Sequence, residues 1–210
     1  MYYQNRTEAG KILAAALEKF RDADAVVLAV PRGGIPVACY VARQLQKPVG
    51  LLMTKKIGHP LYPEYAIGAV SLNDYSTDAN YNISKQWLDD TVRTIRDSLE
   101  KRYRHLMGDH APPEIKDKTV IIVDDGIATG KTILSSIPML KKSQPEKIVV
   151  ATPVAPKEAK DLFKGIADEF ICTYTPVDFY GVGLHYYDFT QVSDAEAERL
   201  LKDCNINEKS

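Results

Sequence analysis

The sequence predicts an α/β fold, in which an open, mostly parallel, twisted sheet carries helices on both faces. Short apolar runs rich in β-branched residues alternate along the chain with longer segments of helical periodicity. The chain has 210 residues, of which 45% are hydrophobic, so it can bury the core of one such domain. Ligands of open parallel sheets bind at the carboxyl ends of the strands, and we expect the functional site there.

Each predicted strand is a short apolar run, and each predicted helix carries its apolar residues on one stripe. The predicted strands are 25–30, 48–53, 66–72, 119–123, 147–153 and 169–173. The predicted helices are 6–20, 35–45, 84–107, 131–142 and 157–164, and Ser84 is the expected N-cap of the longest one. Segment 55–65 is polar and contains Gly, Pro and His, which predicts a loop; 74–82 is rich in turn residues, and 205–210 is predicted to fray.

The composition indicates a soluble protein of a reducing compartment. The 27 basic and 28 acidic residues are interspersed, so no basic stripe indicates nucleic-acid binding. No apolar run reaches the roughly 20 residues of a membrane span, and the polar start does not resemble a signal peptide. The three cysteines lie far apart and the four histidines form no spaced cluster, so we expect no disulfide framework and a cytoplasmic location.

The most informative segment is 120–132, with the sequence VIIVDDGIATGKT. An apolar strand ends in two carboxylates, Asp124 and Asp125, and a loop of small residues leads into the helix that begins at Lys131. The backbone N–H groups at a helix N-terminus favour an anion such as phosphate. Two carboxylates beside that loop suit a ligand with a phosphate and vicinal hydroxyls, as in a ribose 5-phosphate.

Two other interpretations of this segment stay open. Residues 126–132 read GxxxGKT, one residue short of a Walker A loop, which would indicate a nucleotide phosphotransferase. The shorter loop can hold one phosphate but does not wrap a triphosphate in the same way, and the acid pair would repel one. The segment could also be an ordinary strand-to-helix turn with structural glycines, because open α/β sheets contain many such turns.

The same residues resemble the phosphoribosyl-pyrophosphate (PRPP) signature of type I phosphoribosyltransferases. The resemblance implies that Asp124 and Asp125 bind the ribose hydroxyls and that the loop binds the 5-phosphate. The implied phosphate-binding residues are Ile127, Ala128, Thr129, Gly130, Lys131 and Thr132. It also implies Mg²⁺ as cofactor, held mainly by PRPP with Asp124 or Asp125 as the candidate protein ligands, and a homodimer that acts in nucleotide salvage.

Two further segments match elements of this family. Arg32, Gly33 and Gly34 follow the first strand, where the family has its pyrophosphate loop, often with a strained or cis peptide; alone they would read as a plain turn. Segment 55–65 stands where the family has a mobile loop that excludes water from the reaction. There Lys55 is the candidate pyrophosphate ligand, with Lys56 and Glu64 as candidate catalytic residues and Glu64 as an acid/base.

The acceptor is left open by one departure from the family pattern. Enzymes of 6-oxopurine salvage carry a third acid where this chain has Ala128, and loops with Ala-Thr-Gly are typical of adenine- and uracil-type members. We therefore expect a small planar base as acceptor, with a 6-oxopurine less favoured than an adenine- or uracil-type base. The expected core is 22–173 with a helical insertion at 84–108, and the base-binding hood comes from 1–21, from 174–203, or from both. The functional alternatives are a PRPP-binding regulator without turnover and the phosphotransferase already described.

Overall fold

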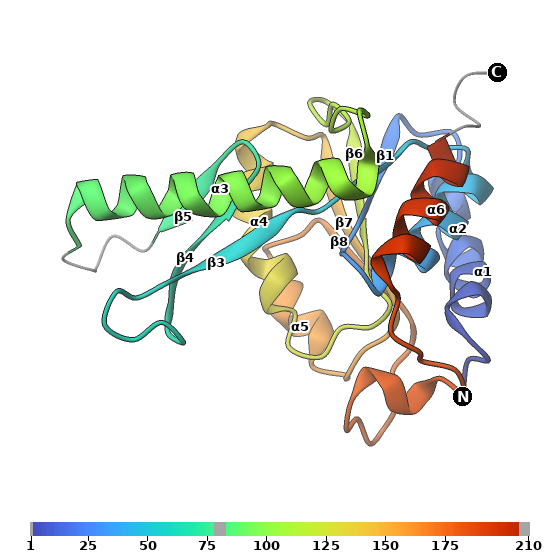
Figure 1. Ribbon diagram of the computed structural model, residues 1–210. Coiled ribbons are helices and arrows are strands. Elements are labelled where there is room, and N and C mark those ends of the chain that lie inside the picture. The colour runs from blue at the N-terminus through green and yellow to red at the C-terminus, as the bar shows by residue number, and fades with distance from the viewer. Residues whose placement is uncertain (1, 78–82, 206–210) are drawn as a thin grey trace.

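A parallel five-stranded sheet forms the centre of the computed structural model, which describes residues 2–77 and 83–205 (Figure 1). The strand order is β2-β1-β6-β7-β8, and every neighbouring pair is parallel. The strands are β1 (Ala25–Ala29), β2 (Val49–Leu51), β6 (Thr119–Val123), β7 (Lys147–Val154) and β8 (Glu169–Tyr174). The α/β class and the parallel sheet are therefore confirmed, and β1 and β6 are buried along their whole length.

Helices cover both faces of this sheet, because successive residues of each buried strand point to opposite sides. Val27 and Ala29 of β1 pack in one core with α1 (Arg6–Ala16), α2 (Gly34–Leu45) and α6 (Asp194–Asn205). Val26 and Leu28 pack in a second core with α4 (Lys131–Lys142) and α5 (Ala159–Phe163). Figure 1 shows these two groups of helices on either side of the strands.

A smaller antiparallel sheet lies beside the central one and corrects one prediction. It consists of β3 (Thr54–Gly58), β4 (Ala66–Ser71) and β5 (Tyr75–Thr77). Segment 55–65 was expected to be a loop, but its first part is β3, in which Ile57 is buried and Lys55 and Lys56 are exposed. The strand was missed because two adjacent lysines hide the alternation of an edge strand. The connection between β3 and β4 is therefore shorter than predicted and comprises only 59–65. The predicted turn-rich segment reaches residues 78–82, which lie outside the described part of the chain.

The long helix α3 (Lys85–Met107) follows this sheet and begins as predicted. The Trp87 N–H donates to Ser84 Oγ at 3.2 Å, so Ser84 is the N-cap. The first and fifth predicted helices are shorter than expected, because α1 continues only as a 3-10 turn (Glu18–Phe20) and α5 ends at Phe163. Helix α6 was not predicted, and residues 206–210 of the predicted frayed tail are not described. No helix of the described residues is both long and apolar enough to cross a membrane.

Candidate functional site

The loops that follow β1 and β6 meet at the carboxyl ends of these neighbouring strands. The Val30 N–H donates to Val123 O at 2.9 Å and so carries the strand pairing to the end of β6. The peptide bond between Pro31 and Arg32 is cis, as the family resemblance led us to expect. The sequence-predicted residues Arg32, Gly33 and Gly34 therefore lie next to the acid pair.

Gly33 and Gly34 allow this close approach because they lack a Cβ. A Cβ on Gly33 would lie 2.2 Å from Asp125 Oδ2, which is inside any allowed contact distance. A Cβ on Gly34 would lie 2.7 Å from the backbone oxygen of Val123. The two glycines thus bring the first loop directly against Asp125, and larger residues would separate the loops.

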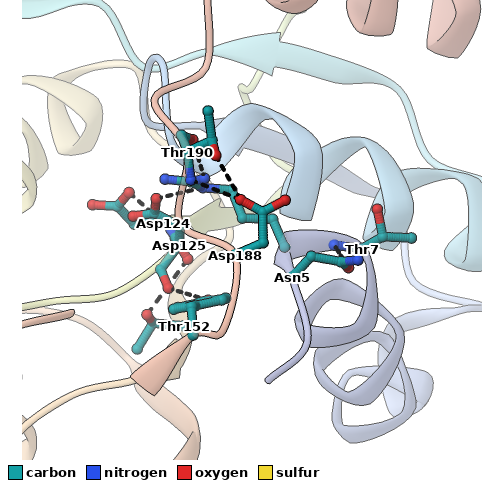
Figure 2. A network of polar contacts seen from close by, with 9 residues as sticks. Asn5, Thr7, Asp124, Asp125, Thr152, Asp188 and Thr190 are labelled. Carbon is teal, nitrogen blue, oxygen red and sulfur yellow. Dashed lines mark hydrogen bonds and ion pairs between the residues drawn. The ribbon is translucent and has the colours of Figure 1, made fainter. Parts of the chain in front are cut away.

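Asp125 is almost enclosed by protein, with 8% of its surface exposed. Arg6 Nε donates to its Oδ2 at 2.8 Å, and the Tyr186 hydroxyl donates to its backbone oxygen at 2.6 Å. Burial raises the pKa of Asp125 above its usual range, and the Arg6 guanidinium opposes this rise. Arg6 belongs to α1 and Tyr186 to the C-terminal third, so segments from both ends of the chain hold this carboxylate. Figure 2 shows the polar contacts around it.

Asp124, the first residue of the acid pair, is half-buried, whereas Asp125 is buried. Protein nevertheless surrounds most of the Asp124 carboxylate. Its Oδ1 accepts the backbone N–H of Asp125 at 2.9 Å. Burial, and then repulsion from the neighbouring carboxylate, raises the pKa of Asp124 well above its usual range. Two close carboxylates in such surroundings attract positive charge and accept hydrogen bonds from hydroxyl groups.

The loop after the acid pair ends at the N-terminus of α4. Gly130 adopts a left-handed conformation with φ of 65° and is the N-cap of this twelve-residue helix. Ile127 is buried and its N–H donates to Val154 O at 2.9 Å, which ties the loop to the sheet. Ala128, Thr129, Lys131 and Thr132 are exposed. The first N–H groups of a helix have no partner within it, so this exposed turn can bind an anion.

Two cavities adjoin the loop after β1. They are called the lysine cavity and the arginine cavity below. The first measures about 260 Å³, and Lys55, Arg102 and Thr132 are among the residues that line it. The second measures 710 Å³ and is lined by Arg6, Arg32 and Arg102, together with Pro31, Gly33, Phe189, Gln191 and Val192.

The other residues predicted for the site lie farther along the antiparallel sheet. Lys56 Nζ and Glu64 Oε2 form an exposed ion pair of 3.0 Å. Glu64 belongs to the 59–65 connection, which Figure 1 shows at the end of the β3–β4 hairpin remote from the central sheet. The structure thus brings Lys55 to a cavity shared with Thr132, whereas Lys56 and Glu64 contact each other.

Sequence reasoning missed several residues of the site, among them Arg6, Arg102 and Asp194. Asp194 Oδ1 accepts from Arg32 Nη1 at 3.0 Å and from Arg102 Nη2 at 2.7 Å. The Arg6 guanidinium lies 4.0 Å from the centre of the Phe189 ring, close enough for a cation–π contact. No local pattern marks these residues, because each partner lies on a distant segment of the chain.

The N-terminal segment and the C-terminal third form one unit over the acid pair. The Tyr3 N–H donates to His185 O and the Tyr187 N–H to Tyr3 O, both at 2.9 Å. Tyr3 and Tyr186 are buried together, while Tyr180 and Tyr187 are exposed. Most of the aromatic residues in 174–189 that could stack on a planar ligand therefore pack within this unit.

The acid pair is compatible with a magnesium ion that a ligand largely coordinates itself. Within residues 2–77 and 83–205, no group of three or more His, Cys, Asp or Glu side chains could hold a metal ion. Mg²⁺ is commonly bound by one or two carboxylates together with substrate phosphates and water. Asp124 and Asp125 supply such carboxylates, so they fit an ion that arrives with a phosphorylated ligand.

Comparison with known proteins identifies relatives along almost the whole chain. A family model described as a phosphoribosyl transferase domain matches residues 1–186. A curated protein of Mycobacterium tuberculosis, named as a phosphoribosyl transferase, is 35% identical over 205 residues. That match covers 95% of this chain but 46% of the relative, so the chain spans about half of the relative's length.

Two solved structures show the same fold. The crystal structure of TT1426 from Thermus thermophilus has a TM-score of 0.85 and 33% identity, and the match covers 97% of this chain and 99% of that one. A hypothetical protein from Neisseria gonorrhoeae, solved with bound ppGpp, has a TM-score of 0.51 and 18% identity, with 97% and 96% coverage. At that identity the second likeness concerns the fold alone.

Proposed function

Since the chain belongs to the phosphoribosyltransferase family, we propose that it transfers the 5-phosphoribosyl group of PRPP to a nitrogen of a planar base and releases pyrophosphate. One observation carries this proposal. The acid pair Asp124–Asp125 follows β6, a short loop leads from it to the exposed N-terminus of α4, and the loop after β1 lies against Asp125. This arrangement suits a ligand with vicinal hydroxyls between two phosphorylated ends.

PRPP, the donor of the phosphoribosyl group, would bind along the acid pair, the turn before α4 and the loop after β1. Asp124 and Asp125 accept hydrogen bonds from the ribose hydroxyls and favour the positive charge that develops at C1. The 5-phosphate binds the exposed turn before α4, through the backbone of Ala128 to Thr132 and the hydroxyls of Thr129 and Thr132, while buried Ile127 anchors this turn. Lys131 adds positive charge there.

The leaving pyrophosphate would lie by the loop after β1. Arg32 supplies a guanidinium, Gly33 and Gly34 allow close backbone approach, and Lys55 lines the adjoining lysine cavity. When bound, Mg²⁺ would neutralise part of the pyrophosphate charge, and Asp124 or Asp125 would be its protein ligands. Lys56 and Glu64 take part if the 59–65 connection moves over the ligand and excludes water from C1.

The acceptor nitrogen would attack C1 beneath the unit formed by both ends of the chain. We assign the hood to 1–21 together with 174–203, because Tyr3 and Tyr186 are buried against each other beside Asp125. The core is then 22–173 with the insertion 84–108. Ala128 replaces the third acid of 6-oxopurine enzymes, so the proposed acceptor is an adenine- or uracil-type base. A homodimer acting in cytoplasmic nucleotide salvage completes the proposal.

A binding experiment and a turnover experiment test this function. Purified protein is titrated with PRPP and, separately, with ATP, each with Mg²⁺, and the melting temperature is followed. PRPP is expected to raise it; protection by ATP alone would indicate the phosphotransferase. Pyrophosphate release is then measured with PRPP and a panel of bases, with and without EDTA, which is expected to abolish turnover. Binding without turnover on any base would favour the regulator.

The role of the acid pair needs a test of its own. Asp125→Asn removes the charge but keeps the size of the side chain, so we expect PRPP affinity to fall at least tenfold. The matched control is Asp109→Asn, at an exposed position after α3. Unchanged PRPP affinity in Asp125→Asn would remove Asp125 from the ribose-binding role.

A further inference from the structure

Arg102, on α3, is a cation that the proposed donor site does not yet include. We propose that Arg102 binds the pyrophosphate group together with Arg32, an inference that rests on the proposed use of PRPP. The arginine reaches this place from the helical insertion, which lies outside the segments that resemble the family signature. Helix α3 would then contribute to ligand binding as well as covering the core.

The contacts of Asp194 show that the two guanidinium groups converge. Arg102 Nη2 and Arg32 Nη1 donate to the same oxygen, Asp194 Oδ1, at 2.7 and 3.0 Å. Arg102 Nη1 donates to the other carboxylate oxygen at 3.0 Å. Two guanidinium groups from different elements can therefore grip one anionic group jointly, which is how arginine binds phosphate oxygens.

The cavities place Arg102 between the parts of the donor site. It lines the lysine cavity together with Lys55 and Thr132, and it lines the arginine cavity together with Arg32 and Gly33. A ribose held at the acid pair, with its 5-phosphate at the turn before α4, would place the pyrophosphate near this boundary. Arg102 is thus within the space that the leaving group must occupy.

The charged side chains around the two cavities suit a polyanion. Arg32, Arg102 and Lys55 supply three positive charges, and Asp194 supplies one carboxylate, with His105 Nε2 3.9 Å from it. Each guanidinium has five N–H donors. Asp194 receives two hydrogen bonds from Arg102 and one from Arg32, which leaves N–H groups on both arginines for a ligand. Asp194 is accordingly a positioning residue for the two guanidinium groups.

Calorimetric titrations with pyrophosphate, PRPP and ribose 5-phosphate, all with Mg²⁺, test the role of Arg102. In Arg102→Gln we expect the affinity for pyrophosphate and for PRPP to fall about 10- to 100-fold, the range for lost charged hydrogen bonds. Ribose 5-phosphate, which lacks the pyrophosphate, should bind within twofold of wild type. Arg102→Lys should lie between, because it keeps the charge but not the planar fork. The control is Arg104→Gln, an exposed position on the same helix.

Asp194→Asn separates direct binding from a structural link between α3 and α6. It weakens the link but leaves both arginines, so it should reduce pyrophosphate affinity less than Arg102→Gln does. Equal losses for all three ligands in both variants would overturn the proposal, as would wild-type pyrophosphate affinity in Arg102→Gln. If wild-type protein binds PRPP and the Arg102 variants bind PRPP and pyrophosphate as tightly as wild type does, the assignment of Arg102 fails while the proposed function stands. If wild-type protein binds neither PRPP nor pyrophosphate, the proposed function fails as well.

Discussion

The ion pair between Arg6 and Asp125 joins the N-terminal helix to the proposed ribose site, and its removal should be costly. Each side chain is 11% exposed, and the Nε–Oδ2 distance is 2.8 Å. Arg6→Met keeps an unbranched chain of similar length over the Phe189 ring but removes the charge. The carboxylate of Asp125 then stays buried without its cation, and the pKa of Asp125, already raised, should rise further.

The expected cost follows from these contacts. Breaking a buried pair by removing one partner costs about 3–5 kcal/mol. The lower end applies here, because Asp125 can become protonated and so avoid part of the penalty. Of this total, the second contact of Arg6, from Nη1 to Thr190 O at 2.8 Å, accounts for about 1 kcal/mol. We therefore expect the free energy of unfolding to fall by about 3 kcal/mol, and the melting temperature by about 6–12 °C.

A double-mutant cycle with Asp125→Asn tests this reasoning. In the Asn background position 125 carries no carboxylate that could lose its cation, so Arg6→Met should cost only about 1 kcal/mol, which gives a coupling energy of about 2 kcal/mol. Urea unfolding at pH 7.5 measures all four proteins. The control is Lys11→Met, an exposed change on the same helix, which should stay within about 0.5 kcal/mol. Additive effects of the two site mutations would refute the reasoning.

Four further substitutions test the same site. Gly33→Ala places a Cβ 2.2 Å from Asp125 Oδ2 and should reduce PRPP affinity at least tenfold in calorimetry; Gly34→Ala meets the backbone instead, and urea unfolding should show a loss of about 1–3 kcal/mol. Tyr186→Phe leaves the Asp125 carbonyl without its buried donor, and unfolding should become about 1–3 kcal/mol easier. Because the pKa of Asp124 is raised in the folded state, its contribution to stability is present below the usual pKa of an aspartate and is lost as the pH rises through the raised pKa. Asp124→Asn should therefore flatten the fall in melting temperature above about pH 4, and an unchanged slope would contradict this.

The segment 119–142 could be predicted from the sequence because its signals are local. Five buried residues of one strand, two acids, a small-residue loop and a helical stripe follow one another directly, and each appears in the structure where expected. The glycines of the first loop could be recognised in the same way, since a loop beside a buried strand needs residues that permit close approach. Local pattern thus identified the backbone of the proposed site.

The charged partners of the site could not be predicted in this way. Arg6 lies 119 residues from Asp125, and Arg32 lies 162 residues from Asp194. Neither pair produces a periodicity, because the fold alone brings these segments together. Strand β3 was missed for a different reason: Lys55 and Lys56 are both exposed at its edge, so charge hid the alternation that marks a strand.

These distant partners change the electrostatic description of the unliganded site. The motifs alone suggest that Asp125 and Arg32 are unpaired charges before a ligand binds. In the structure, Asp125 instead forms an ion pair with Arg6, and Arg32 forms one with Asp194. A phosphorylated ligand must therefore share or exchange ion pairs that already exist, rather than neutralise open charges. Such a site discriminates by geometry, because only a ligand that presents hydroxyls at Asp125 and phosphate oxygens at Arg32 can compensate both pairs at once.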